Sequence, residues 1–300
     1  MIKGKDLAVA YRIYPKVSKT PAAFKDNKYR LSELCLRSFK QCLEGQGINV
    51  RVFAILDNCP DEYSKLFRQY FLDGEIEFIK VDGIGNRKTF DLQMKLLLNQ
   101  DFSENIYFAE DDYFYLPGMF SEMLDFLSQP GVDFITPYDH PDYYTLELHR
   151  HRNYIKTHNN RHWRSAATTC MTFLTTKNNL KKAHRIFKSY TKRNLDSSLW
   201  LNATKYRIRN PISILSICIN NKRFLKNIKK AWLDGWGWMH ILFGRRWNLW
   251  APIPSIATHM ESAYLAPCID WYKDFDRVSM EIEKREPITT LSINKLPTIR

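Results

Sequence analysis

The sequence predicts an α/β fold with a mostly parallel sheet that is flanked by helices. In the first half of the chain, short apolar segments alternate with segments of helical periodicity. This alternation is typical of parallel sheets that helices cover on both faces. Proline, glycine and acidic residues mark the ends of the segments. With 300 residues and 44% hydrophobic content, the chain can form one large α/β domain or a domain with an appendage.

The first half is expected to contain five strands and four helices. The expected strands cover residues 7–14, 50–56, 76–81, 105–109 and 132–136. The expected helices cover residues 32–44, 61–71, 88–99 and 117–128. Ser32 is a suitable N-cap for the first of these helices. Because ligands of such sheets bind beyond the carboxyl ends of the strands, the polar residues that follow the strands are candidate site residues.

The second half is less regular. Residues 138–165 are rich in Tyr, His, Asn and Arg and are expected to form a long loop or lid. A strand over 167–175 and a basic helix over 178–190 are expected to follow. The apolar segment 212–219 precedes the basic segment 220–231, and this pair suits either an anionic membrane surface or a core helix with a solvated basic face. Residues from about 276 to 300 are expected to form a loosely attached tail.

The net charge of +13 is unevenly distributed. Residues 148–233 contain 20 lysines and arginines and one acid, Asp196, so this region carries +19 and the rest of the chain −6. This asymmetry indicates an anionic partner such as nucleotide phosphates, a lipid phosphate, a membrane surface or nucleic acid. A solvated basic surface is the alternative interpretation.

The expected location is the cytoplasm, with peripheral attachment to the inner face of the membrane as a further hypothesis. The first residues have no hydrophobic core of a signal peptide, and no segment approaches the roughly 20 apolar residues of a membrane span. The six cysteines are scattered without a CxxC pair, so neither a zinc site nor a disulfide framework is expected.

Three consecutive acids, Glu110, Asp111 and Asp112, directly follow the apolar segment 106–109. Clustered carboxylates at a strand end repel one another and resist burial. A divalent cation, Mn²⁺ or Mg²⁺, would relieve this repulsion and could also bridge phosphates. The cluster therefore predicts a metal site, with a solvated turn as the alternative.

Two more polar groups follow strands at the same expected edge of the sheet. Asp57 comes after the second strand, where it can also begin an Asx turn before Pro60. The segment Asn86-Arg87-Lys88 follows a turn with two glycines and begins a helix, where backbone N–H groups and cations suit a diphosphate. The convergence of three such groups is stronger evidence for a site than any one of them.

Two acids are candidate general bases. Asp196 is surrounded in sequence by Lys192, Arg193, Lys205 and Arg207, which would lower its pKa if they lie close to it in space. An ionised carboxylate suits a base that deprotonates an attacking hydroxyl, although Asp196 can also begin a helix. Asp234 is the second candidate base.

Over roughly residues 5–265, this pattern resembles the GT-A fold of glycosyltransferases, in particular the bacterial family-2-like type that builds surface polysaccharides such as lipopolysaccharide. The family's Asp-x-Asp motif is similar to Glu110-Asp111-Asp112, with Glu in place of the first Asp. The resemblance implies that Asp112 and Glu110 bind the metal and that Glu110 or Asp111 faces a ribose or a metal-bound water. It also implies that Asp57 holds the base or ribose, that Asn86, Arg87 and Lys88 lie near the diphosphate, and that His259 completes the metal site.

The expected function is therefore metal-dependent transfer of a sugar, with a UDP-sugar favoured and inversion expected, to a hydroxyl of a glycan or lipid-linked acceptor. Residues 1–140 would form the nucleotide-sugar-binding half, and residues 141–275 the acceptor half with a basic helical appendage. A nucleotidyltransferase is the nearest alternative. A nucleic-acid-binding module or a membrane-associated scaffold that uses residues 148–233 is a further alternative, which the convergence at one sheet edge disfavours.

Overall fold

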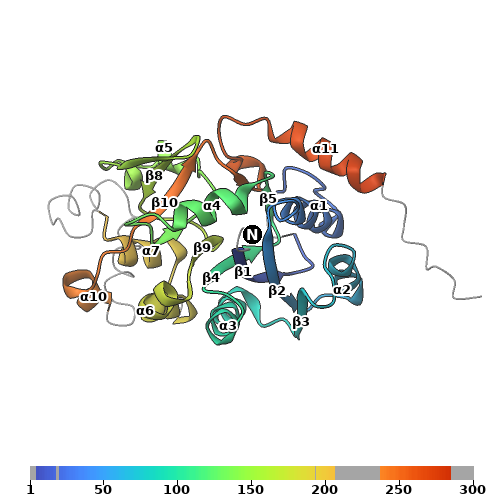
Figure 1. Cartoon of the computed structure of the whole chain (residues 1–300), viewed down its shortest axis with the longest axis horizontal. Coiled ribbons are helices and arrows are strands. Elements are labelled where there is room, and N and C mark those ends of the chain that lie inside the picture. The colour runs from blue at the N-terminus through green and yellow to red at the C-terminus, as the bar shows by residue number, and fades with distance from the viewer. Residues whose placement is uncertain (1–4, 18–19, 193, 207–236, 285–300) are drawn as a thin grey trace, which may run out of the picture.

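The computed structural model describes residues 5–17, 20–192, 194–206 and 237–284. At its centre lies a nine-stranded sheet made of β1 (Lys5–Ile13), β2 (Ile48–Asp57), β3 (Ile76–Val81), β4 (Asn105–Glu110), β6 (Phe134–Ile135), β7 (Ile155–His158), β8 (Arg161–Ala166), β9 (Phe173–Thr176) and β10 (Leu249–Ile253). The strand order is β3-β2-β1-β4-β9-β6-β10-β8-β7, and Figure 1 shows the arrangement. Only β8 and β9 run opposite to the other strands of this sheet in the described part of the chain.

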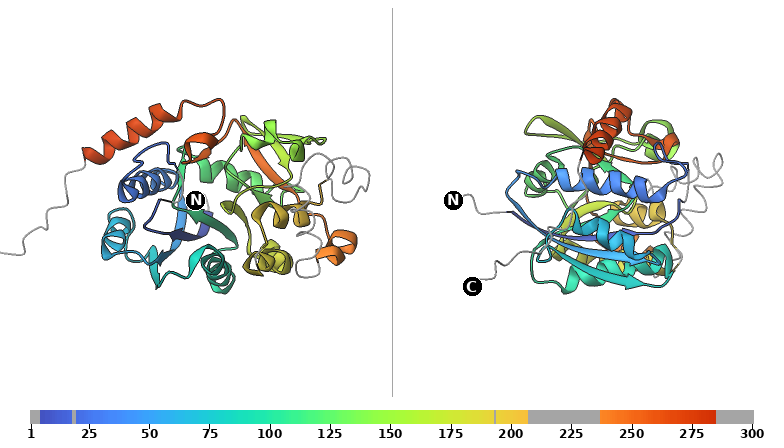
Figure 2. Two further views of the ribbon diagram at one scale, coloured as in Figure 1. Left: turned by 180° about the vertical axis from the view of Figure 1, so that it is seen from behind. Right: turned by 90° about the vertical axis from the view of Figure 1, so that its right-hand side faces the viewer.

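Helices cover both faces of the sheet (Figures 1 and 2). One face packs against α1 (Lys28–Gln41), α2 (Asp61–Arg68), α4 (Met119–Leu127) and α11 (Trp271–Glu283). The other packs against α3 (Gly85–Asn99), α6 (Lys177–Lys188) and α7 (Asp196–Thr204). Short helices complete the described chain, namely α5 (Asp142–Thr145), α10 (Gly237–Phe243), η1 (Glu147–His149), η2 (Ser189–Lys192) and η4 (Ser262–Tyr264). The predicted α/β class, with a mostly parallel sheet between helices and a helical C-terminal region, is confirmed.

The alternation of side chains along β1 joins these two layers. Leu7, Val9 and Tyr11 are buried against the layer of α1 and α2, whereas Ala8 and Ala10 face α3. Each large apolar side chain that is fully buried in this way stabilises the fold by roughly 1.5–3 kcal/mol relative to an exposed one. The same alternation directs the next residue, Arg12, to the face of α3, at the carboxyl end of the strand.

The predicted elements of the first half are present, with one correction at the start of α1. This helix begins at Lys28, and Ser32 lies buried inside it. Its N-cap is Asn27, whose Oδ1 accepts a hydrogen bond from the backbone N–H of Arg30 at 3.0 Å. The prediction that Ser32 caps the helix was wrong because Asn27 supplies an earlier acceptor.

The prediction of a long loop over residues 138–165 was also wrong. This segment contains α5, η1 and the antiparallel hairpin of β7 and β8, which extends the sheet beyond β10. The hairpin is fixed by Trp163, which is buried and stacks on Phe126 of α4 with ring centroids 4.2 Å apart. The strand expected over 167–175 is shorter than predicted and forms β9, which pairs antiparallel with β4.

A second, two-stranded sheet of β5 (Tyr113–Tyr115) and β11 (Ala257–His259) was not predicted from the sequence. The strands are antiparallel, and His259 pairs with Tyr113. Because β5 starts only three residues after the end of β4, this pairing carries the distant His259 to the end of β4. The backbone N–H of Met260 donates a hydrogen bond to the carbonyl of Asp112 at 2.8 Å, which also holds β11 close to the end of β4.

The expected C-terminal tail begins within a packed helix. Residues 276–283 belong to α11, where Val278 is fully buried and Glu281 accepts a hydrogen bond from Gln41 of α1. Strands from both expected halves of the chain, 1–140 and 141–275, share the central sheet. The segments 212–219 and 220–231 and the candidate base Asp234 lie outside the described residues.

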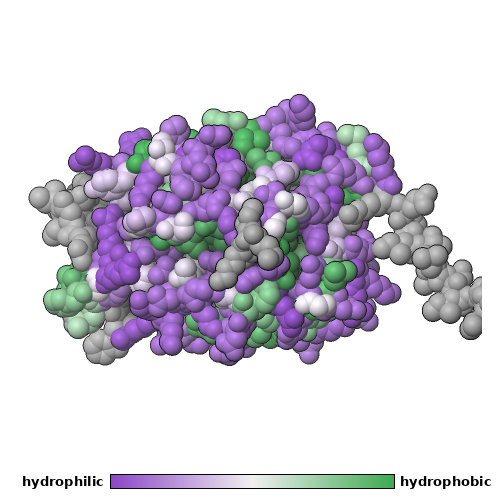
Figure 3. All heavy atoms as spheres, in the orientation of Figure 1, coloured by the Kyte–Doolittle hydropathy of each residue, from purple (hydrophilic) through white to green (hydrophobic). Residues whose placement is uncertain are grey.

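In the described ranges, none of the helices combines the length and the apolar character that crossing a bilayer requires. The face shown in Figure 3 is mostly hydrophilic, with a hydrophobic patch where α10 lies. Met239, Leu242 and Phe243 are the exposed large apolar side chains of this helix.

Candidate active site

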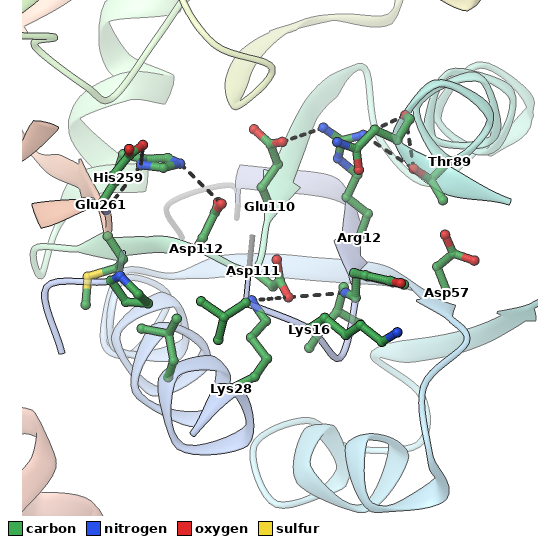
Figure 4. A pocket seen from close by; sticks show the side chains of 17 residues that line it. Arg12, Lys16, Lys28, Asp57, Thr89, Glu110, Asp111, Asp112, His259 and Glu261 are labelled. Carbon is green, nitrogen blue, oxygen red and sulfur yellow. Dashed lines mark hydrogen bonds and ion pairs between the residues drawn. The ribbon is translucent and has the colours of Figure 1, made fainter. Parts of the chain in front are cut away.

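The pleat of β4 separates the three acids of the strand end. Glu110 lies on the side of α3, where its carboxylate pairs with Arg12 of the neighbouring β1 and accepts a hydrogen bond from Thr172 at 3.0 Å. Asp111 lies on the side of α1, where its Oδ2 is 2.7 Å from Lys28 Nζ. Figure 4 shows that the carboxylates point in different directions. Glu110 and Asp111 therefore each meet a cation from another element.

Asp112 lies just beyond the strand and faces β11. Its Oδ2 is 3.2 Å from His259 Nε2. The other nitrogen of this ring, Nδ1, accepts a hydrogen bond from the backbone N–H of Glu261 at 3.3 Å. The second carboxylate oxygen, Oδ1, is buried and has no hydrogen-bond partner among the described residues. The predicted proximity of Asp112 and His259 is thus present in the structure.

Asp57 is buried at the carboxyl end of β2, where it holds the turn that precedes α3. Its Oδ1 accepts from the N–H of Ile84 at 2.8 Å, and its Oδ2 accepts from the N–H of Gly85 at 2.9 Å. Gly83 and Gly85 both have positive φ, which the turn requires and which glycine adopts without steric cost. Asp57 therefore reaches the site, as expected, while both of its oxygens already hold backbone amides.

These groups line one cavity at the carboxyl ends of β1, β2 and β4, which we name the first cavity (Figure 4). It lies where the strand order turns from β3-β2-β1 to β4, the switch point at which ligands of open α/β sheets bind. Its charged residues in the described chain are Arg12, Lys16, Lys28, Asp57, Glu110, Asp111, Asp112 and Glu261.

The segment 86–88 contributes less to this cavity than the sequence predicted. Asn86 lines it, and its backbone carbonyl accepts a hydrogen bond from Arg12 at 2.8 Å. Arg87 and Lys88 are exposed and do not belong to the wall of the first cavity. The cationic groups of the wall are instead Arg12, Lys16 and Lys28, which the sequence analysis did not identify. One signal was present for Arg12, a charged residue inside an otherwise apolar strand.

Electrostatics distinguishes the two aspartates. Burial raises the pKa of Asp112, but the interaction with His259, together with the charges of Lys28 and Arg12, outweighs it and holds this pKa below its usual value. For Asp111, burial dominates, and Asp112 adds to it, so the pKa of Asp111 is raised in spite of Lys28. Burial alone would lower the pKa of Lys28, yet the adjacent aspartates raise it. Asp112 is therefore the stronger acid of this pair.

Asp112 and His259 fit a two-ligand site for a divalent cation. Asp112 Oδ1 is a buried acceptor without a partner in the described chain, and a carboxylate with an imidazole suits Mn²⁺. Glu110 is turned toward Arg12 and Thr172, so the three expected ligands Glu110, Asp112 and His259 do not converge. Among the described residues no group of three or more His, Cys, Asp or Glu could hold a metal. Phosphate and water oxygens would supply the remaining ligands, as is usual for Mg²⁺ sites.

A second cavity adjoins the first. Its wall includes Asp196 at the first turn of α7, Tyr143 of α5 and residues 168–170, which connect β8 and β9. His259 and Glu261 line both cavities. The two cavities are therefore adjacent to each other at His259 and Glu261.

The surroundings of Asp196 differ from those expected. One carboxylate oxygen, Oδ1, accepts from the N–H of Ser197 at 2.8 Å, and the helix N-cap is Leu195. Lys205 lies at the opposite end of α7, where its ammonium group donates to the carbonyl of Gly244. Lys205 is therefore not close to Asp196, because nine residues of helix separate the two positions by roughly 13 Å. Asp196 lines the second cavity.

No protein-family model and no curated protein matches the sequence. Among solved structures, a mannosyltransferase of Pyrobaculum calidifontis in complex with GDP-Man and Mn²⁺ matches 69% of this chain and 53% of its own, at 12% identity and a TM-score of 0.43. Residues 1–349 of S. aureus TarS, in complex with UDP, match 66% of this chain and 54% of their own, at 13% identity and a TM-score of 0.42.

A 4-diphosphocytidyl-2C-methyl-D-erythritol synthase of Anaerococcus prevotii matches 66% of this chain and 83% of its own, at 11% identity and a TM-score of 0.38. The present chain thus spans about half the length of the mannosyltransferase and of the TarS segment. At these identities and TM-scores, the function has to be argued from the geometry of the two cavities.

Proposed function

We propose that the protein is a glycosyltransferase of GT-A type that moves a sugar from a nucleoside-diphosphate sugar to a hydroxyl of a glycan or lipid-linked acceptor. The observation that carries this proposal is the junction of the two cavities at His259. The first cavity, at the strand ends, suits the nucleotide. Asp196 lines the second cavity, and its carboxylate supports a role of this cavity in binding the acceptor hydroxyl.

The donor diphosphate would lie in the first cavity between Asp112 and the cations Arg12, Lys16 and Lys28. The described wall holds five carboxylates against these three cations, so a diphosphate alone would meet a surplus of negative charge. Mn²⁺ or Mg²⁺, held by Asp112 and His259, would supply the positive charge that binds the phosphates and stabilises the departing diphosphate. Arg12 and Lys28 add fixed positive charge, and Asp111 and Glu110 hold these two cations in place.

Asp196 is the proposed general base. It would accept the proton of the acceptor hydroxyl as the oxygen attacks the anomeric carbon, and the bond from this carbon to the diphosphate breaks. The N–H of Ser197 keeps its carboxylate oriented at the start of α7. A single direct displacement of this kind inverts the configuration of the anomeric carbon. Asp234 remains the second candidate base.

Peripheral attachment to an anionic membrane on the cytoplasmic side remains part of the proposal. Arg245 and Arg246 follow the exposed apolar residues of α10, and α6 presents a basic face with Lys181, Lys182 and Arg185. This combination suits a lipid-linked acceptor, because apolar and cationic side chains together bind anionic interfaces.

A thermal-shift screen of nucleoside diphosphates and nucleotide sugars, with and without Mn²⁺, tests the proposal. One nucleotide, which we expect to be UDP, should raise the melting temperature of the protein in a Mn²⁺-dependent manner. Asp112→Ala should abolish this rise. The matched control is Asp276→Ala, an exposed acid of α11 outside both cavities. Turnover of a nucleoside triphosphate without turnover of any nucleotide sugar would instead identify a nucleotidyltransferase. If no nucleotide stabilises the protein, both the glycosyltransferase and the nucleotidyltransferase are contradicted.

A further inference from the structure

The basic side chains of the second half of the chain include a group that neither cavity uses. Residues 148–233 carry 20 basic residues and one acid. Yet the described walls of both cavities contain no lysine or arginine from this region. Exposed arginines of the described chain, among them Arg152 and the later Arg246, therefore belong to a different surface.

Part of this surface is a continuous group of rings and cations, which we name the basic strip and which consists of His151, Arg152, Tyr154, Tyr206 and Arg246. The guanidinium of Arg246 lies 4.3 Å from the centre of the Tyr206 ring. The centres of the Tyr206 and His151 rings are 4.1 Å apart. Arg152 is next in the chain, and its guanidinium lies 6.0 Å from the centre of the Tyr154 ring. Cationic groups and tyrosine rings therefore alternate along the basic strip.

The basic strip begins at the wall of the second cavity. His149 belongs to this wall, and its carbonyl accepts a hydrogen bond from the backbone N–H of His151 at 2.9 Å. At the other end of the strip, Arg246 comes three residues after the end of α10. Figure 1 shows α5, α7 and α10 at the same end of the molecule. The strip therefore extends from the second cavity to the residues that follow α10.

The two arginines of the basic strip are not committed to carboxylates. Both are exposed, and neither Arg152 nor Arg246 forms an ion pair in the described ranges. Arg245 differs in this respect, because it pairs with Asp133. A guanidinium that lies against a ring keeps the N–H groups at its edge available for a carboxylate or phosphate. The strip therefore presents two cations that can bind an anionic ligand.

We propose that the basic strip binds the anionic continuation of an acceptor glycan whose reacting sugar enters the second cavity. This inference deepens the proposed glycosyl transfer and rests on it. Guanidinium groups bind carboxylates and phosphates through paired hydrogen bonds, and tyrosine rings pack against the apolar faces of sugars. An acidic glycan offers both kinds of group along one chain. The position of the strip beside the second cavity favours such a glycan over a bilayer surface, because one acceptor chain then occupies contiguous parts of the protein.

The test measures the binding of hexagalacturonate, an acidic hexasaccharide, to the full-length protein by isothermal titration calorimetry without donor. Maltohexaose, a neutral hexasaccharide, is the matched ligand. Hexagalacturonate is expected to bind at least about tenfold more tightly, because only its carboxylates can pair with the arginines of the strip. No binding of hexagalacturonate, or equal affinity for the two saccharides, overturns the inference.

Arginine variants locate the binding surface. Arg152→Ser and Arg246→Ser should each weaken the binding of hexagalacturonate by about tenfold, since each removes a charge-assisted hydrogen bond. Arg68→Ser is the matched control and should leave the affinity unchanged. Arg68 is an exposed arginine of α2 that also lies over a ring, that of Phe78, at 5.5 Å. Equal affinities of the strip variants and the control overturn the inference.

Tyrosine variants test the contribution of the rings. Tyr154→Ser should weaken the binding of hexagalacturonate by about threefold, because it removes a ring that packs on a sugar. Tyr272→Ser is the matched control, since Tyr272 of α11 is 53% exposed and Tyr154 is 54% exposed. An unchanged affinity in Tyr154→Ser would reduce the strip to a site for the anion alone and would overturn the assignment to a glycan.

Vesicles of phosphatidylglycerol and phosphatidylcholine test the bilayer alternative. If hexagalacturonate does not bind, and Arg152→Ser and Arg246→Ser release the protein from these vesicles, the strip is a membrane-binding surface and the inference is wrong. A failure of saccharide binding together with a Mn²⁺-dependent nucleotide response overturns the inference and leaves glycosyl transfer standing. Strip-dependent binding of hexagalacturonate by a protein that binds no nucleotide would overturn glycosyl transfer, and with it the role of the strip in holding an acceptor.

Discussion

The two cavities that meet at His259 differ in how their charges are balanced. In the first, Arg12 pairs with Glu110, Lys28 pairs with Asp111, and Lys16 also lines the wall. In the second, three carboxylates have no lysine or arginine in the described wall. The distribution of charge along the sequence suggests the opposite, because the first cavity is built from the acidic part of the chain, whereas half of the residues that line the second cavity come from the basic part. The charge of a site therefore follows from a few long-range contacts and cannot be read from the charge of a region.

The largest expected effect concerns the second cavity. Asp196→Asn should lower kcat for transfer by about 10²–10⁴-fold, because an amide cannot take up the proton of the attacking hydroxyl. The affinity for the nucleoside diphosphate, which the first cavity binds, should stay within about twofold of the wild-type value, since the two functions are separate. Steady-state kinetics and nucleotide titration measure both. A variant that transfers sugar at the wild-type rate would remove Asp196 from the mechanism.

In the first cavity, Arg12→Met should reduce the free energy of unfolding by about 3 kcal/mol, because it leaves the carboxylate of Glu110 largely buried without its cation. Chemical denaturation measures this change. The control is Lys80→Met, which breaks an exposed pair with Asp61 and should have little effect because water screens that pair. Equal effects of the two substitutions would show that the pair of Arg12 and Glu110 is not structurally important.

A smaller effect is expected for Lys28→Met. The affinity for the nucleoside diphosphate should fall by about tenfold, since a charge-assisted hydrogen bond to phosphate contributes about 1.5 kcal/mol. Lys40→Met, at the other end of α1, is the matched control and should leave the affinity unchanged. Isothermal titration calorimetry measures the affinity of each variant for the nucleoside diphosphate. An unaltered affinity in Lys28→Met would assign this lysine to holding Asp111 only.

The smallest expected effect is a pH dependence from His149. Its pKa is lowered by burial from 6.5 to about 3 in the folded protein, so between these values the unfolded chain binds more protons and stability rises with pH. From pH 6.5 to 5.5, His149 should contribute a loss of about 1 kcal/mol. Denaturation curves at both pH values give the free energy of unfolding of the wild type and of His149→Asn. The loss of this free energy between pH 6.5 and 5.5 should be larger for the wild type by this amount. The same loss of unfolding free energy in both proteins would contradict a neutral His149 in the second cavity.

Much of the sheet could be predicted from the sequence because its parallel strands are local patterns of apolar residues. Asp57 and the acids 110–112 follow such strands, and their meeting at one edge needs only the topology. The partners of these acids could not be predicted in this way. Lys28 and Asp111 are 83 positions apart, and their contact depends on how α1 packs on the sheet.

The parts of the cavity walls that come from the second half of the chain could also not be predicted from sequence patterns. Residues 138–165 lack regular alternation, so their hairpin became evident only through the burial of Trp163 against α4. His259 was selected by resemblance, whereas Glu261, two positions later, was overlooked although it lines both cavities. Thr172 was missed because its contact with Glu110 depends on the pairing of β9 beside β4.

A crystal structure of the protein with UDP and Mn²⁺, with the ion located by its anomalous scattering, tests the central claim most directly. The predicted result is a Mn²⁺ peak bound by Asp112 and His259, with the diphosphate between the ion and Lys28 and the sugar end directed toward Asp196. A nucleotide bound elsewhere, or an ion bound without Asp112, would contradict the assignment of the first cavity to the donor.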